Sequence, residues 1–250
     1  MTCREMDLLL SSGAELPPEA RRHLAQCTAC RGIAAAFAVP AAPCVRASLP
    51  ETIEPVQPLA SPAVFAILLA LAAAILAAGA AAWKGILGPP LLSPLQKASI
   101  FGVLLILLAV AAGVVALDMR PGARSLRGAT LFVLAFGAME AVFFALFHDY
   151  RAGSFLQQGL RCFSMGIACA AATALLTWLI VRRGYLVAPV SAGAAAGVLA
   201  GLAGLATLEL HCPIQYVPHL VVWHAGVVVA SAATGALIGK LAHFSRHTLR

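Results

Sequence analysis

Long apolar stretches dominate the sequence after residue 60. Six of them are about 20 residues long and nearly free of Lys and Arg, which is the length that an α-helix needs to cross the hydrocarbon core of a bilayer. They cover residues 62–83, 98–117, 128–147, 162–181, 186–208 and 219–241. Pro and Gly residues separate the stretches, as is typical of turns and helix ends. The pattern predicts six transmembrane helices.

The first 39 residues follow a different pattern, in which polar and apolar positions are mixed. Met6, Leu9 and Leu10 recur at helical spacing and predict a short amphipathic helix over residues 2–12. Pro17 and Pro18 favour the start of a second helix. Residues 40–60 are rich in proline, which favours an extended linker. We therefore expect an all-α protein with a small head (1–39), a linker (40–60) and a six-helix membrane domain (61–250).

Composition and charge support the membrane class. The chain is 61% hydrophobic and 11% charged, whereas soluble domains are roughly 25% charged. Its net charge of +7 comes from residues that mostly flank the apolar stretches and form no aromatic-interleaved basic patch. These residues indicate membrane topology and lipid contact, and they do not indicate direct binding of nucleic acid.

The distribution of Lys and Arg predicts the orientation, because cytoplasmic segments carry the excess of positive charge. The first ten residues are too polar for a signal peptide, so the N-terminus is expected in the cytoplasm. With that start, thirteen Lys and Arg residues fall in inner segments and four in outer loops. We expect a multi-pass protein of the bacterial inner membrane with both termini in the cytoplasm.

A metal-binding pattern stands near the N-terminus. His23, Cys27 and Cys30 follow a His-x3-Cys-x2-Cys spacing, and Cys3 precedes them. Residues four apart lie on one face of a helix, so His23 and Cys27 can point at one ion. Three thiolates with one imidazole form a closed structural zinc site. The alternatives are a redox-active dithiol and accidental spacing. A thioredoxin-like dithiol needs a surrounding βαβ pattern, which the sequence lacks.

Residues 2–37, with this spacing at their centre, resemble the zinc-binding anti-sigma domain of bacteria. The resemblance implies that zinc shapes a helical head, which holds an extracytoplasmic-function sigma factor in the cytoplasm. It further implies release by an envelope or redox signal. Ile33 and Phe37 are the expected contacts with the sigma factor, and packing inside the head is the alternative role for both.

A second group of ionisable residues lies at the outer ends of the predicted spans. Its members are Glu140, His148, Glu209, His211, Cys212, His219 and His224. Such groups are costly inside a membrane and usually face the bundle interior. They are interpreted in three ways: a protonatable or metal-binding sensor, a thiol sensor in which Cys212 pairs with Cys162, or interhelical hydrogen bonds without further function. No role is assigned to Cys44 or Cys169.

The stretch from Leu210 to Gly226, with its His-Cys-Pro and Trp-His elements, resembles the end of a six-span family of negative regulators of sigma F. This resemblance implies the same non-enzymatic role as that of the head. The sequence shows no P-loop, nucleophile elbow or HExxH motif. The competing hypothesis is a multi-pass redox enzyme or transporter that uses its intramembrane Glu and His residues.

Overall fold

The computed structural model describes six ranges of the chain: residues 2–12, 16–38, 61–119, 126–151, 155–181 and 188–248. The chain divides into two compact units, residues 1–58 and 59–250. All regular elements in the described ranges are helices, and no strand occurs in them. The expected all-α class is therefore confirmed.

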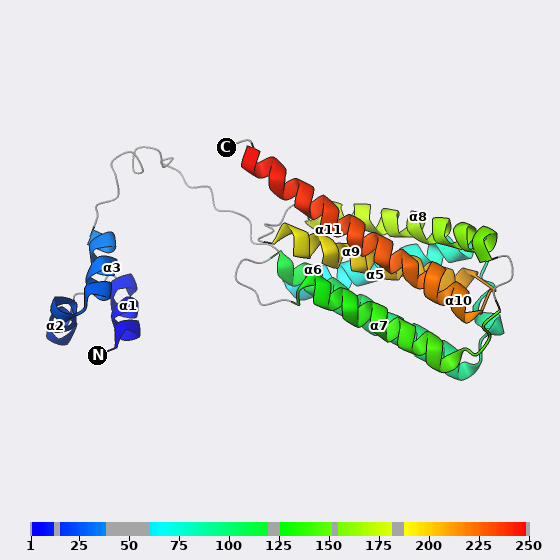
Figure 1. The fold of residues 1–250 in the computed structure, drawn as a ribbon, viewed down its shortest axis with the longest axis horizontal. Helices are drawn as coiled ribbons and strands as arrows, with labels where there is room; N and C mark the ends of the chain where they lie inside the picture. The colour runs from blue at the N-terminus through cyan, green and yellow to red at the C-terminus, as the bar shows by residue number, and fades with distance from the viewer. Residues whose placement is uncertain are drawn as a thin grey trace. The chain divides into compact units, whose positions relative to one another are not determined.

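Within its described residues, the first unit has three short helices, α1 (Cys3–Ser12), α2 (Pro18–Gln26) and α3 (Thr28–Ala38) (Figure 1). Pro18 occupies the first position of α2, where its missing N–H group costs nothing. The buried centre of the unit consists of Met6, Ala20 and Cys30. Such a small apolar centre cannot by itself stabilise a unit of this size.

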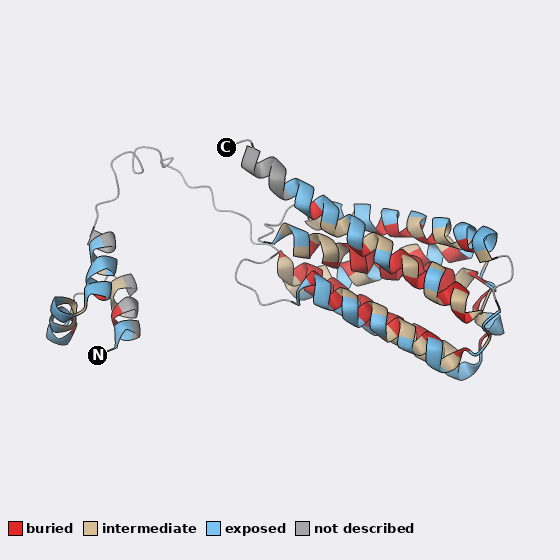
Figure 2. Cartoon of the chain, in the orientation of Figure 1, coloured by how far each residue is buried: buried red, intermediate tan, exposed pale blue. Residues whose placement is uncertain are grey.

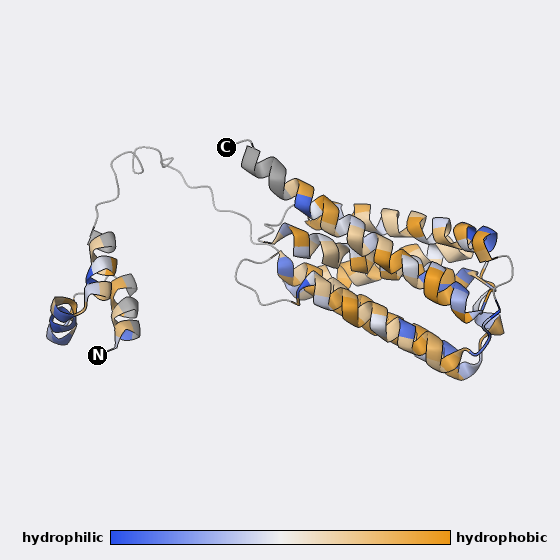
Figure 3. Cartoon of the chain, in the orientation of Figure 1, coloured by the Kyte–Doolittle hydropathy of each residue, from blue (hydrophilic) through white to orange (hydrophobic). Residues whose placement is uncertain are grey.

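The second unit is a bundle of six long helices (Figure 1). They are α5 (Pro62–Lys84), α6 (Pro94–Asp118), α7 (Gly128–Leu146), α8 (Phe155–Val181), α9 (Pro189–His211), and a last helix made of α10 (Val217–His219), the π-helical segment η2 (Leu220–His224) and α11 (Ala225–Thr248). A short 3-10 turn, η1 (Pro89–Leu91), precedes α6. All six are long and apolar enough to cross a membrane, which confirms the predicted number. In Figure 3 the colour of hydrophobic residues runs along most of the length of these helices.

Two helices begin earlier than the apolar windows predict. Helix α6 begins at Pro94 because Ser93 and Gln96 form a capping box, in which each side chain accepts a hydrogen bond from the other residue's backbone N–H. Helix α8 begins at Phe155 and carries the exposed Arg161 within its second turn. A window chosen to avoid Arg begins after that residue, so it misses the polar start of the helix.

Helix α9 forms the centre of the bundle. It packs against α5, α6, α7, α8 and α11, and every residue from Gly197 to Glu209 is buried. Buried positions concentrate along its middle and the facing sides of its neighbours (Figure 2). A polar group within this stretch of α9 therefore lies inside the bundle.

Small residues allow α9 and α11 to approach closely. A Cβ atom on Gly193 would overlap the carbonyl oxygen of Gly235, and a Cβ on Gly235 would overlap the carbonyl oxygen of Gly193. Gly197 and Gly239 face backbone atoms of the opposite helix in the same way. Because these facing residues are small, the backbones of α9 and α11 lie in direct contact.

Candidate metal centres

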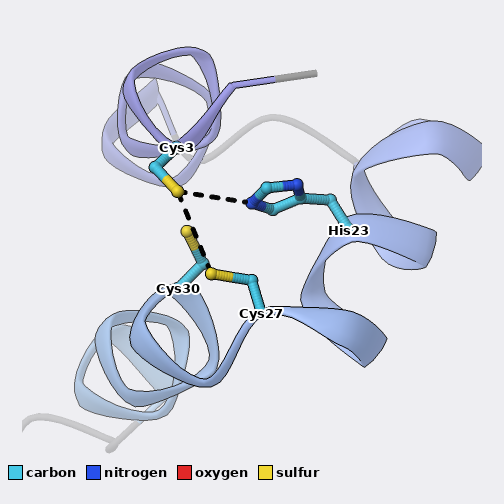
Figure 4. Close-up of side chains that lie close together, drawn as sticks. All are labelled: Cys3, His23, Cys27 and Cys30. Atoms are coloured by element: carbon cyan, nitrogen blue, oxygen red, sulfur yellow. Dashed lines mark hydrogen bonds between the residues drawn. The ribbon is translucent and has the colours of Figure 1, made fainter.

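The four predicted ligands of the head lie together. Cys3 comes from the start of α1, His23 from α2, Cys27 from the corner between α2 and α3, and Cys30 from α3 (Figure 4). Their ligand atoms all lie within 4.8 Å of one another. Cys3 Sγ is 3.7 Å from His23 Nε2 and 3.9 Å from Cys27 Sγ. The four side chains point toward one common volume.

The local backbone differs from the single helix face expected for His23 and Cys27. Helix α2 ends at Gln26, and Cys27 has an extended backbone conformation with φ −101° and ψ 110°. The Cys27 N–H still donates to the carbonyl of His23 at 2.8 Å, which keeps the two residues adjacent. Cys27 therefore turns the chain from α2 into α3 and places Cys30 beside itself.

The thiols of the head cannot all ionise without a cation. The backbone N–H of Cys30 and then its side chain lower the pKa of the Cys27 thiol. Burial, followed by the nearby Cys3 and Cys27 side chains, raises the pKa of Cys30 to about 12. Like charges disfavour further ionisation at such short distances. A bound dication would remove this conflict, because it stabilises all of the thiolates together.

The donor set and its spacing fit zinc. A tetrahedral site with Zn–S bonds of about 2.3 Å has S–S edges of about 3.8 Å, and the Cys3–Cys27 separation is 3.9 Å. Three sulfurs and one imidazole nitrogen complete four-coordination without an open position. The arrangement suits a structural ion rather than catalysis.

The structure describes the side chain of only one of the two expected sigma-factor contacts. Ile33 lies on α3 and is 41% exposed, so its side chain is available to a partner. The side chain of Phe37 lies outside the described residues, as does all of Cys44. Ile33 is thus a large apolar side chain on α3 that a partner can reach.

Part of the second predicted group converges at one end of the bundle. Glu209 Oε1 is 2.7 Å from His224 Nδ1, and Cys212 Sγ is 3.5 Å from His219 Nε2. Cys162 joins these residues from α8, with its Sγ 3.4 Å from that of Cys212. The thiol-sensor interpretation paired Cys162 with Cys212, and the two residues lie side by side here as free thiols.

The remaining members of that group lie elsewhere. His211 Nδ1 is 2.7 Å from the carbonyl oxygen of Gly85, and His148 is exposed. Glu140 is half-buried on α7, and neither of its carboxylate oxygens has a hydrogen-bond partner among the described residues. Cys169 is buried in α8 and accepts a hydrogen bond from Thr207 Oγ1 at 3.1 Å.

Comparison with known proteins assigns the larger unit. A family model described as negative regulator of sigma F matches residues 49–242. The match covers all six long helices up to residue 242 and leaves out the head. No curated protein and no solved structure matches the chain.

Proposed function

The chain belongs to the negative regulator of sigma F family, and from this premise we propose that it is a membrane-bound anti-sigma factor. Its head binds a sigma factor of the extracytoplasmic-function type on the cytoplasmic side of the bacterial inner membrane. The six-helix bundle anchors the head and receives the signal for release. The role of the family is regulatory, and the proposed activity is binding rather than catalysis.

The ligand cluster of the head carries this proposal. The family match begins at residue 49, so it does not itself explain α1, α2 and α3. These helices share a buried centre of three residues but bring four zinc ligands together. Zinc binding stabilises small domains by on the order of 10 kcal/mol. A zinc ion would therefore hold the three helices in the fixed arrangement that a docking surface requires.

The surface of α3 supports the choice of a protein partner. Ile33 is exposed although it is large and apolar. Arg31 directly follows the ligand Cys30, and its side chain forms a hydrogen bond to the backbone of α2. Arg31 Nη2 donates to the carbonyl of Ala25 at 2.7 Å, which fastens α3 to the end of α2. An apolar side chain on such a braced helix is suited to enter a groove of the sigma factor.

The bundle supports membrane anchorage. Its outer surface exposes large apolar side chains on α5, α6, α7, α8 and α11, including Leu71, Ile75, Leu105, Val133 and Leu237. Contact of such an apolar surface with lipid is favourable, whereas its exposure to water would be unfavourable. The excess of Lys and Arg in alternate connections supports cytoplasmic termini, which places the head in the compartment of RNA polymerase.

Capture of the sigma factor by the full chain tests the proposal. The chain is purified in detergent and loaded with Zn²⁺, and binding of extracytoplasmic-function sigma factors from the same organism is measured with and without EDTA. Cys27→Ser should abolish capture because it removes a ligand from the head. Cys169→Ser is the matched control, since it replaces a thiol outside the head, and it should retain capture. A zinc-loaded chain that captures no sigma factor would refute the proposal.

A further inference from the structure

We propose that the bundle contains a second metal site, formed by Cys162, Cys212, His219 and His224, which binds a tetrahedral transition-metal ion of the zinc class. The four ligand atoms lie within 4.8 Å of one another. The site is separate from the cluster in the head. It can be tested without assuming that the protein binds a sigma factor.

The ligands come from three parts of the bundle that meet at one end. Cys162 lies near the start of α8, Cys212 directly follows α9, and His219 and His224 end α10 and η2. The Cys162 and Cys212 sulfurs are 3.4 Å apart, and Cys212 Sγ is 3.5 Å from His219 Nε2. For zinc, S–S edges of about 3.8 Å and S–N edges of about 3.6 Å are expected. Small side-chain shifts therefore suffice to enclose an ion.

His224 is oriented as metal-ligating histidines are. Its Nδ1 is 2.7 Å from Glu209 Oε1, and both side chains are 0% exposed. Its other nitrogen, Nε2, is buried and has no hydrogen-bond partner among the described residues. A buried nitrogen without a partner is costly, whereas a carboxylate on Nδ1 and a metal on Nε2 form a recurrent triad. A metal ion at the cluster satisfies the nitrogen.

The π-helical segment explains how two histidines five residues apart serve one site. In an α-helix with 3.6 residues per turn, positions five apart point about 140° away from each other. Segment η2 (Leu220–His224) follows His219 directly and has the wider turn in which residue i bonds to residue i+5. The rings of His219 and His224 consequently lie 5.1 Å apart, centre to centre. Such π segments are frequent at functional sites.

The surroundings exclude water and favour a soft ion. Cys212 is 1% exposed, and Cys162 packs against an apolar cluster that includes Leu208 and Val227. One half-buried thiol, one buried thiol and two buried imidazoles suit a tetrahedral S2N2 site, for which zinc is the usual ion. A hard ion such as magnesium prefers oxygen ligands, and the four residues offer none.

Metal stoichiometry of the full chain in detergent tests the proposal. The chain is purified with a reductant, loaded with Zn²⁺ and freed of excess ion, and bound zinc is then measured by mass spectrometry. Two ions per chain are expected. Cys27→Ser combined with Cys30→Ser removes the head site and should leave one ion. Cys162→Ser combined with Cys212→Ser should also leave one, and all four substitutions together should leave none.

Controls and a second readout keep the outcome decisive. Cys169→Ser and His148→Ala alter a thiol and an imidazole outside the cluster and should retain two ions. The chain with Cys27→Ser and Cys30→Ser keeps an unaltered bundle, so it is titrated with Co²⁺. It should show the intense visible bands of tetrahedral cobalt and thiolate charge transfer. If this chain binds no Zn²⁺ and shows no such bands, the proposal is overturned, whatever the folding of the bundle variants.

Discussion

Glu209 and His224 form a hydrogen-bonded pair, 2.7 Å from Oε1 to Nδ1, in which both side chains are completely buried. The two residues belong to α9 and η2, so the pair joins the central helix to the last one. Burying an isolated charge costs free energy. The hydrogen bond between the two side chains offsets that cost. The carboxylate fixes the orientation of the imidazole and leaves Nε2 directed away from Glu209.

Replacing this carboxylate should weaken metal binding at the bundle. Glu209→Gln removes the charge but keeps the size of the side chain, and loss of such an outer partner typically costs about 10–100-fold in metal affinity. The affinity is measured in the chain with Cys27→Ser and Cys30→Ser, by competition with a chromophoric chelator. Glu140→Gln is the control, because Glu140 is a membrane-embedded carboxylate outside the ligand group. Equal affinities of the two variants would contradict the assigned role of Glu209.

The sequence predicted the helices well because hydropathy determines them locally. Six apolar stretches gave six long helices, and the cluster of the head follows from ligands close along the chain. The exact starts of α6 and α8 depend on Ser93 and on the polar residues before Cys162. These features are invisible to a search for uncharged windows.

Convergence at the bundle end could not be predicted in the same way. His211 precedes Cys212 in the sequence and His219 follows it. Of these two histidines, only His219 has its ring near the Cys212 sulfur, whereas the His211 ring contacts the backbone of Gly85. The rotation of each helix about its axis decides such outcomes, and hydropathy does not specify that rotation. The π-helical turn before His224 adds a further change of direction. Its only trace in the sequence is a five-residue histidine spacing that an α-helix would not align.

Removal of zinc should expose the head to proteases. The described helices α2 and α3 contain the trypsin sites Arg21, Arg22 and Arg31, which are protected as long as the helices stay folded. Because zinc supplies on the order of 10 kcal/mol in such small domains, EDTA should accelerate cleavage at these sites at least about tenfold. Cleavage is followed by mass spectrometry of the full chain.

The Cys27→Ser chain provides the reference for this experiment. It should be cleaved rapidly from the start, and EDTA should cause no further acceleration, because its head no longer closes around an ion. If EDTA leaves cleavage of the unaltered head unchanged, zinc does not determine the fold of these helices.

The charge distribution predicts where a reporter is active. Alkaline phosphatase needs disulfides, which form in the periplasm and not in the cytoplasm. A fusion after Tyr150, between α7 and α8, should be active, and a fusion after Thr248, at the end of α11, should be inactive. Enzyme activity in whole cells, normalised to the amount of fusion protein, measures the orientation. The reverse pattern would place the head outside the cytoplasm and exclude a sigma factor as its partner.

Because Gly193 contacts Gly235, replacing Gly193 by alanine should destabilise the bundle, although alanine has a higher helix propensity than glycine. In Gly193→Ala, the new Cβ meets the backbone of Gly235, and the two helices must separate. Overpacking of this kind costs about 1–3 kcal/mol. Gly137 on α7 has no atom within 4 Å of a new Cβ, so Gly137→Ala should stabilise the helix by up to about 1 kcal/mol.

The opposite signs make the pair of variants a direct test of helix packing. The free energy of unfolding in mixed detergent micelles is measured for both, relative to the unaltered chain. Gly235→Ala should destabilise as Gly193→Ala does, because the two glycines face each other and neither backbone can yield. Stabilisation by either substitution would mean that α9 and α11 lie farther apart than this contact requires. Cys212, which directly follows α9, and His219, which ends α10, would then also lie farther apart than the metal site requires.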